Sequence, residues 1–236
     1  MKRITMMLIR NILLLPYMIV KLFYHASHVE KYTDEQHDRM LKFIVKRANK
    51  GGNVTLETYG RENIPEKDGF MLFPNHQGMY DMLALVGTCH KPISTVAKKE
   101  VEKVIFLKQV LKCIRAFYID REDVRQSMRV IMNITEEVKK GRNYVIFAEG
   151  TRSKKGNNTL EFKGGSFKAA TKAKSPIVPV VLVNSFVPFD SKTLKQITVQ
   201  VHYLKPLVYD EYKDMKTVEI AEYTRNEIQK VLEKVG

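Results

Sequence analysis

The sequence contains no tryptophan and only two cysteines among its 236 residues. Cys89 and Cys113 lack CxxC spacing, so they cannot form a disulfide framework or a structural zinc site. We therefore expect an intracellular protein with reduced thiols. Twelve glycines and eight prolines are too few for a fibrous chain, and a hydrophobic fraction of 44% excludes wholesale disorder.

Several chemical signatures are also absent. The chain has no Walker sequence and no GxGxxG after a strand, which argues against kinases, ATPases and dehydrogenases. It has no GxSxG elbow of the kind found in α/β-hydrolases. No HxxxH or HExxH pattern occurs, so the sequence implies no metal.

Positive charge, in contrast, is in excess and concentrated. The chain has 40 lysines and arginines against 26 aspartates and glutamates, a formal net charge of +14. The excess lies in residues 1–29, 91–115 and 139–174, and the rest of the chain is slightly acidic. Such concentrations attract nucleic acid, anionic lipid or phosphorylated substrates, and composition does not choose among them.

The first apolar run covers residues 4–24. Arg10 and Lys21 interrupt it and Pro16 would kink it, which disfavours a bilayer-spanning helix of about 20 apolar residues. A secretory signal would need a small-residue cleavage site, and packing on the protein's own core is the plain alternative. We predict that residues 1–25 lie monotopically in the cytoplasmic face of a membrane, with Arg10 and Lys21 reaching phosphate headgroups.

A second amphipathic helix is predicted over residues 34–50. It should end at Gly51-Gly52, because paired glycines are a strong signal for the end of a helix. We accordingly divide the chain into N-terminal membrane-associating helices at 1–50 and an α/β domain at 51–236.

Short β-rich runs alternate with helical patterns in the second part. This alternation predicts an α/β fold with a mixed, largely parallel central sheet flanked by helices, preceded by the N-terminal membrane-associating two-helix segment. Strands are expected at 54–59, 70–73, 93–97, 116–119, 144–147, 177–183 and 197–203, and helices at about 79–88, 100–112, 122–140, 165–174 and 216–235.

In such sheets, functional residues gather in the loops that follow the carboxyl ends of the strands. This rule points to residues 74–81, 98–100, 120–121 and 149–153. The first and last of these loops carry side chains suited to chemistry.

The first loop holds Asn75, His76 and Asp81. Residues five apart diverge by about 140° on a continuous helix, so His76 and Asp81 meet only if the histidine lies in a turn before the helix that carries the aspartate. An aspartate bonded to one ring nitrogen leaves the other nitrogen free to act as a general base. A lone histidine near a lone aspartate is, however, more often a coincidence of surface residues than a catalytic pair.

The last loop follows another apolar strand. Gly150 permits close approach of the backbone, Thr151 supplies a hydroxyl, and Arg152 supplies a planar fork suited to phosphate oxygens. The alternative interpretation is an ordinary charged loop capped by Glu149 and Arg152.

Taken in order, these segments resemble the 1-acyl-glycerol-3-phosphate acyltransferase (lysophosphatidate acyltransferase) family of glycerolipid acyltransferases. One matching block is weak support, but the matches run in order from about residue 54 to 205. They are Asn75, His76 and Asp81 of an Asn-His-x-x-x-x-Asp block, Lys98 and Glu100 of a Lys-x-Glu element, the strand ending in Asp-Arg at 116–121, residues 147–153, the Phe-Lys-Gly-Gly stretch at 162–165 and the strand with a central proline at 177–181.

Two residues depart from the family pattern. Ala148 stands where the family usually has proline, which would loosen the turn before Glu149. Arg115 stands where the family often has glycine, and we expect it to alter the fit of the acceptor.

The resemblance implies direct acyl transfer without a covalent enzyme intermediate. His76, oriented by Asp81, would take the proton from a glycerol hydroxyl, which then attacks an acyl thioester. The acceptor's phosphate would be held by Lys98, Arg121 and Arg152.

The other substrate-binding residues implied by the resemblance are Asn75, Glu149, Gly150 and Thr151. Gly150 and Thr151 would shape the phosphate pocket, and Glu149 would position Arg152 or the acceptor. Cys89 and Cys113 then become core residues rather than nucleophiles.

The implied activity moves a fatty acyl group from acyl-CoA or acyl-carrier protein to the sn-2 hydroxyl of 1-acyl-glycerol 3-phosphate, giving phosphatidic acid. No bound cofactor and no nucleic acid are implied, and 51–236 would be the acyltransferase domain. The nearest alternative is the same chemistry on glycerol 3-phosphate, a lysophospholipid or a lyso-aminolipid. A distant one is a non-catalytic basic protein that binds a lipid surface or nucleic acid.

Overall fold

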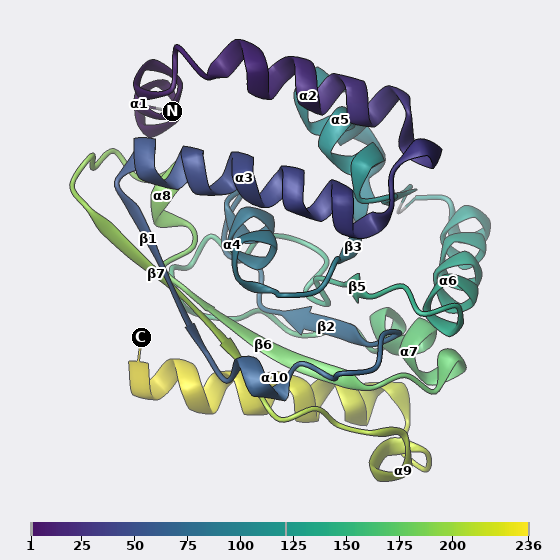
Figure 1. Cartoon of the computed structure of the whole chain (residues 1–236). Coiled ribbons are helices and arrows are strands. Elements are labelled where there is room, and N and C mark those ends of the chain that lie inside the picture. Colours follow the sequence, from purple (N-terminus) through teal and green to yellow (C-terminus); the bar gives the residue numbers. More distant parts are fainter. Residues whose placement is uncertain (1, 121, 236) are drawn as a thin grey trace.

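The computed structural model of the chain describes residues 2–120 and 122–235. Its centre is a seven-stranded sheet with the order β1-β7-β6-β2-β5-β3-β4 (Figure 1). Neighbouring strands are parallel except β6 and β7, which are antiparallel, so the predicted mixed, largely parallel sheet is confirmed. The strands are β1 (Val54–Tyr59), β2 (Met71–Pro74), β3 (Ser94–Lys98), β4 (Phe117–Ile119), β5 (Tyr144–Val145), β6 (Ile177–Val183) and β7 (Ile197–Tyr203).

Helices cover both faces of this sheet. In Figure 1, α3 (Asp34–Gly52) and α4 (Asp81–Thr88) lie above it, and α10 (Thr217–Val235) lies below. The other elements are α1 (Lys2–Arg10), α2 (Leu15–Ser27), η1 (Val29–Lys31), η2 (Arg61–Asn63), η3 (Lys99–Lys103), α5 (Ile105–Cys113), α6 (Val124–Lys139), η4 (Gly164–Phe167), α7 (Lys168–Ala173), α8 (Val187–Asp190) and α9 (Tyr209–Tyr212).

Strand β6 shows how the two cores are built. Val178 and Leu182 pack in the cluster that contains residues of α3 and α4, whereas Ile177 and Val181 pack in the cluster that contains residues of α6, α7 and α10. Because both faces of the strand are buried, residues 177–183 are an uninterrupted apolar run rather than an alternating one.

Strand β5 is shorter than the expected 144–147. Ile146 still donates its N–H to the carbonyl of Leu72 (2.9 Å), but the chain has left the sheet by Phe147. The ring of Phe147 instead lies 4.1 Å, centroid to centroid, from the ring of His76. The end of this predicted strand therefore belongs to a functional loop.

The N-terminal apolar run forms two helices instead of the expected one. α1 and α2 meet at an angle of 100° around residues 11–14. Asn11 is buried at this corner, where its side-chain amide donates to the carbonyls of Met7 (2.8 Å) and Arg47 (3.1 Å). Pro16 lies in the first turn of α2, where its missing N–H costs no helical hydrogen bond.

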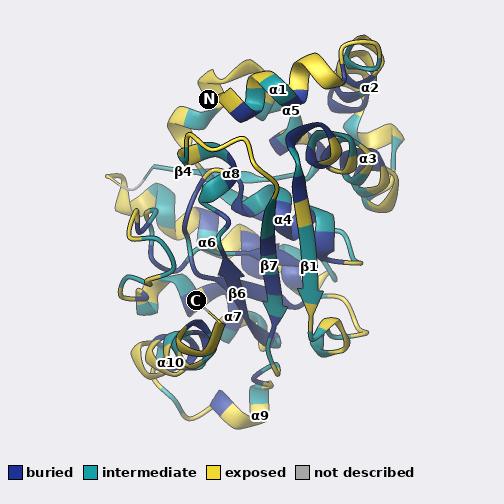
Figure 2. Cartoon of the chain, turned by 90° about the vertical axis from the view of Figure 1, so that its left-hand side faces the viewer, coloured by how far each residue is buried: buried dark blue, intermediate teal, exposed yellow. Residues whose placement is uncertain are grey.

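No single helix in the described part of the chain is long and apolar enough to cross a membrane, although α1 and α2 together reach that length and composition. Many residues of α1, α2 and the turn between them are exposed (Figure 2), and several of these have large apolar side chains. Leu13 is 93% exposed, Ile12 63% and Val20 68%. Arg10, expected to reach headgroups, instead donates to the side-chain oxygen of Asn53 (2.7 Å).

Helix α3 ends at Gly52, so the predicted end at Gly51-Gly52 is confirmed. The left-handed residue that caps the helix is Asn53, with φ 53°, and not one of the glycines. The two glycines lie in the last turn of the helix, where they allow close packing of α1. A β-carbon at Gly51 would lie 2.5 Å from the Asn11 amide, and one at Gly52 would lie 2.3 Å from the Met7 methyl.

Arg3 fastens α1 to the body of the protein. Its guanidinium is buried and donates to the carbonyls of Gly52, Thr193 (2.7 Å) and Lys195 (2.9 Å). One side chain thus joins α1, the end of α3 and the loop before β7. The division of the chain between residues 50 and 51 stays a prediction.

Candidate active site

The predicted site residues follow strands that are neighbours in the sheet. His76 comes after β2, Arg152 after β5, and Lys98 ends β3, which pairs with β4. These strands are parallel, so their carboxyl ends share one edge of the sheet. Arg121, which follows β4, lies outside the described residues.

His76 and Asp81 are in direct contact. His76 lies in the loop after β2, and Asp81 is the first residue of α4, where a negative charge is favoured by the helix dipole. The ring Nδ1 of His76 donates to Asp81 Oδ2 at 2.7 Å, and the aspartate side chain is 1% exposed. Nε2 has no hydrogen-bond partner within residues 2–120 and 122–235, and the side chain is 22% exposed.

Asp81 is held by further donors around the same loop. The backbone N–H groups of Gln77 and Gly78 donate to its Oδ2 at 2.7 and 3.1 Å. The hydroxyl of Ser185 donates to its Oδ1 at 2.5 Å. The donors besides His76 are neutral, so they fix the orientation of the carboxylate without cancelling its negative charge. That charge can therefore stabilise a protonated imidazole.

A glycine is required at position 78. A β-carbon there would lie 2.8 Å from both Asp190 Oδ2 and the Cα of Phe186. The loop between His76 and Asp81 therefore passes directly against α8, which allows the five-residue spacing to close into a hydrogen bond.

The loop after β5 holds the backbone of His76 from the other side. Glu149 is buried, and its Oε1 accepts the N–H of His76 (2.8 Å) while its Oε2 accepts the N–H of Leu160 (3.0 Å). Ser153 donates its N–H to the carbonyl of His76 (2.8 Å). Burial raises the pKa of Glu149, and the hydrogen bonds from the backbone N–H groups of His76 and Leu160 oppose that increase.

Asn75 bridges two strands behind the site. Its side-chain amide donates to the carbonyl of Leu182 (3.0 Å), and its side-chain oxygen accepts the N–H of the same residue (2.7 Å). The residue is buried, so it ties the end of β2 to β6.

The remaining predicted residues are more exposed. Gly150 has a left-handed φ of 73°, and its position lies beside the amine of Lys163. Thr151 is exposed, and Arg152 is half-buried with Nη1 4.0 Å from Asp190 Oδ1. Lys98 is exposed and pairs with Glu100 at 2.8 Å.

Ser185 and Gln77 were not predicted as site residues. Gln77 accepts the N–H of Ser185 (2.9 Å), and its amide donates to the side-chain oxygen of Asn157 (2.9 Å). Ser185 follows the carboxyl end of β6, so the rule that located the other loops also applied here. Gln77 carried no signal of its own.

Arg115 does not face the acceptor side, contrary to expectation. Its guanidinium bonds to Glu30 (2.5 Å) and Asp34 (3.0 Å), so it holds η1 and α3 against the end of α5. Its φ of 51° lies in the region that favours glycine, the residue often found here in the resembling family.

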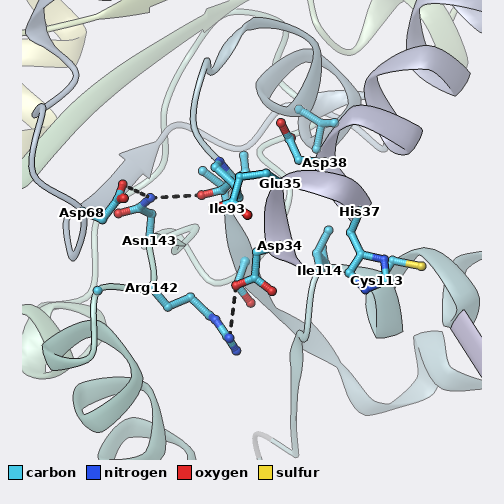
Figure 3. A pocket seen from close by; sticks show the side chains of 14 residues that line it. Asp34, Glu35, His37, Asp38, Asp68, Ile93, Cys113, Ile114, Arg142 and Asn143 are labelled. Atoms are coloured by element: carbon cyan, nitrogen blue, oxygen red, sulfur yellow. Dashed lines mark hydrogen bonds and ion pairs between the residues drawn. The ribbon is translucent and has the colours of Figure 1, made fainter. Parts of the chain in front are cut away.

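A hollow lies at the opposite edge of the sheet, and Figure 3 shows the side chains that line it. This hollow of about 60 Å³ is lined by residues that precede β3 and β5, together with acidic residues of α3. Asp34 pairs with Arg142 (3.1 Å), and Asp68 accepts from the Asn143 amide (3.0 Å). These groups satisfy one another, and no histidine–carboxylate pair occurs among the described residues that line the hollow.

The described part of the chain contains no cluster of side chains suited to bind a metal ion. No group of three or more histidine, cysteine, aspartate or glutamate side chains is placed to hold an ion there. Both thiols are buried, and burial raises the pKa of Cys89 to about 11 and that of Cys113 to about 12. They are therefore unsuited to nucleophilic attack at neutral pH.

Comparison with known proteins gives consistent matches. A sequence profile of the acyltransferase family matches residues 55–183, and a Saccharomyces cerevisiae 1-acyl-sn-glycerol-3-phosphate acyltransferase is 31% identical over 188 residues. That match covers 78% of this chain and 61% of the relative. The Helicobacter pylori protein of the same name is 34% identical over 142 residues, covering 60% of this chain and 59% of the relative.

The fold has a solved counterpart. The crystal structure of a 1-acyl-sn-glycerophosphate acyltransferase from Thermotoga maritima superposes with a TM-score of 0.76 at 21% identity, covering 98% of both chains. The sequence matches cover less of the relatives than this structural match does. This chain spans about three fifths of the length of the curated relatives.

Proposed function

The chain belongs to the acyltransferase family, and from this premise we propose that it acylates the sn-2 hydroxyl of 1-acyl-glycerol 3-phosphate to give phosphatidic acid. The observation that carries the proposal is the 2.7 Å bond between His76 Nδ1 and Asp81, which leaves Nε2 free at the carboxyl edge of the sheet. The names of the relatives support the choice of acceptor.

The proposed reaction needs one proton shuttle. Nε2 of His76 takes the hydroxyl proton of the acceptor as its oxygen attacks the thioester carbonyl. The resulting imidazolium is stabilised by the buried charge of Asp81. When the carbon–sulfur bond breaks, the departing sulfur takes that proton, so the products are ester and thiol and the enzyme returns to its starting state.

The basic residues at the same edge would bind anionic groups. Arg152 and Lys98 would hold the acceptor's phosphate together with Arg121, with Gly150 and Thr151 shaping the pocket. Asn75 and Glu149 would act through the backbone, because their polar atoms already bond to Leu182, His76 and Leu160. The donor would be acyl-CoA or acyl-carrier protein, whose anionic handles suit the basic chain.

The reaction is tested by replacing His76. In His76→Ala, thiol release from acyl-CoA with 1-acyl-glycerol 3-phosphate should fall to background, while His90→Ala, at an exposed histidine outside the site, should keep full turnover. Offering wild-type protein lysophosphatidic acid, glycerol 3-phosphate, a lysophospholipid and a lyso-aminolipid identifies the acceptor. Normal turnover by His76→Ala would refute the proposed base.

We also propose that α1 and α2 bind the cytoplasmic face of a membrane. The exposed side chains Leu13 and Val20 would enter the acyl region, at about 1.5–3 kcal/mol each. Leu13→Glu with Val20→Glu should therefore weaken flotation with phosphatidylglycerol vesicles at least tenfold. Val218→Glu, at a position on α10 that is 67% exposed, should leave flotation unchanged. Equal flotation of all three proteins would place membrane binding on another surface.

A further inference from the structure

The hydroxyl of Ser185 is buried against the carboxylate of Asp81. Ser185 is 0% exposed, and its Oγ lies 2.5 Å from Asp81 Oδ1, on the opposite oxygen from the one that accepts His76. We propose that Ser185 is a positioning residue for acyl transfer, acting on the imidazole through Asp81. This inference rests on the proposed function, since it requires His76 to be the base.

The fold brings Ser185 to this position from 104 residues away. Strand β6 lies beside β2, and the two are parallel, so the end of β6 reaches the same edge as His76. The chain then turns at Asn184, whose φ is 60° and whose N–H donates to the side-chain oxygen of Asn157 (2.9 Å). The turn directs Ser185 toward the start of α4.

The serine has two possible acceptors but only one hydroxyl proton. Its Oγ is 2.9 Å from Gln77 Oε1 and 2.5 Å from Asp81 Oδ1. The charged and closer carboxylate is the stronger acceptor, so the proton belongs to that contact. Gln77 Oε1 keeps the backbone N–H of Ser185 at 2.9 Å, and this bond does not need the hydroxyl.

Ser185 therefore has one separable effect on the site. Its hydroxyl is the closer of two donors to Oδ1, at 2.5 Å against 3.1 Å for the N–H of Gly78, and it keeps Oδ2 aligned with the imidazole Nδ1 and with the N–H of Gln77. The other charged groups around the loop are Glu149, which is bonded to backbone, and Arg152 and Asp190, which lie 4.0 Å apart. In the described part of the chain, neither of these carboxylates hydrogen-bonds to the His76 ring.

Replacing Ser185 by alanine removes the hydroxyl and keeps the backbone bond to Gln77. We expect kcat of Ser185→Ala to fall about 10- to 100-fold with the acceptor KM unchanged, because a hydrogen bond to a buried charge is lost. Ser185→Cys fills the space with a weak donor, and its kcat should stay close to that of the alanine variant.

The matched control lies just before the same strand. Ser175 is also buried, and its hydroxyl has no hydrogen-bond partner in residues 2–120 and 122–235. Ser175→Ala should therefore keep the wild-type kcat. Thermal unfolding of each variant shows whether a loss of rate is a loss of fold.

A double-mutant cycle separates positioning from general packing. In the Asp81→Asn background the Ser185→Ala change should cost less than threefold in residual kcat, because the charge on which it acts is gone. Full additivity, or wild-type kcat in either Ser185 variant, would overturn the inference. Active His76→Ala protein would instead overturn the proposed function, so the two failures are distinguishable.

Discussion

The two edges of the sheet both place carboxylates beside cationic or ionisable partners, but with opposite consequences. At the carboxyl edge, Asp81 is buried and held by two backbone N–H groups, a hydroxyl and one imidazole. At the amino edge, the partly exposed Asp34 is paired with two guanidinium groups, Arg115 and Arg142. Neutral donors orient a charge, whereas guanidinium groups cancel it, so only the first carboxylate can stabilise a new positive charge on a histidine.

The largest expected difference between the edges comes from removing each carboxylate charge. Asp81→Asn should lower kcat by about 10⁴-fold, because the imidazolium loses its partner and the ring its orientation. Asp34→Asn should keep kcat and reduce the free energy of unfolding by about 1 kcal/mol, since its pairs are partly solvated. Steady-state kinetics and chemical denaturation check both. A large fall of kcat in Asp34→Asn would break the comparison.

Replacing one arginine at each edge should give a smaller difference between the two edges. Arg152→Ala should raise the acceptor KM about tenfold or more with a smaller effect on kcat, because one charge-assisted contact to phosphate is lost. Arg142→Ala, whose guanidinium bonds to Asp34 and Glu137, should leave the acceptor KM unchanged. Initial rates over a range of lysophosphatidic acid concentrations measure both. An unchanged acceptor KM in Arg152→Ala would assign this arginine a structural role.

The smallest functional effect is expected at the cysteines, one of which, Cys113, lines the amino-edge hollow. Their folded pKa values of about 11 and about 12 lie above the unfolded value of about 8.5. Folding thus disfavours the thiolate, and stability should fall as the pH rises above about 8.5. At pH 8 the native thiols should react with a disulfide reagent at least 100-fold more slowly than in denaturant. Rapid native labelling at full activity would show that these sites are open.

The parts of the fold that could be predicted are those set by local pattern. The β-rich runs at 177–183 and 197–203 correctly predicted the bounds of β6 and β7. The alternation of strands with helices correctly predicted a mixed sheet. The spacing of His76 and Asp81 allowed a contact, which the structure shows. In both cases the partners are close in sequence or repeat with a regular period.

The parts that escaped prediction depend on distant contacts. Ser185 meets Asp81 across 104 residues, and the glycines of α3 are explained only by the helix that crosses them. Arg115 has a left-handed backbone conformation, and its guanidinium pairs with residues of η1 and α3. The sequence around position 115 predicts neither. The short helices α8 and α9, of four residues each, are below the length at which periodicity is informative.

The hydrogen bonds of the buried Arg3 guanidinium restrict how α1 can move. Since one buried guanidinium joins α1 to the end of α3 and to the loop before β7, α1 is attached to the body of the protein by direct hydrogen bonds and not only by the connecting chain. If α1 and α2 bind a membrane as proposed above, this attachment would keep His76 in one orientation relative to the lipid surface. The lipid acceptor would then have to move to the imidazole, because the attached helix cannot bring the imidazole to the lipid.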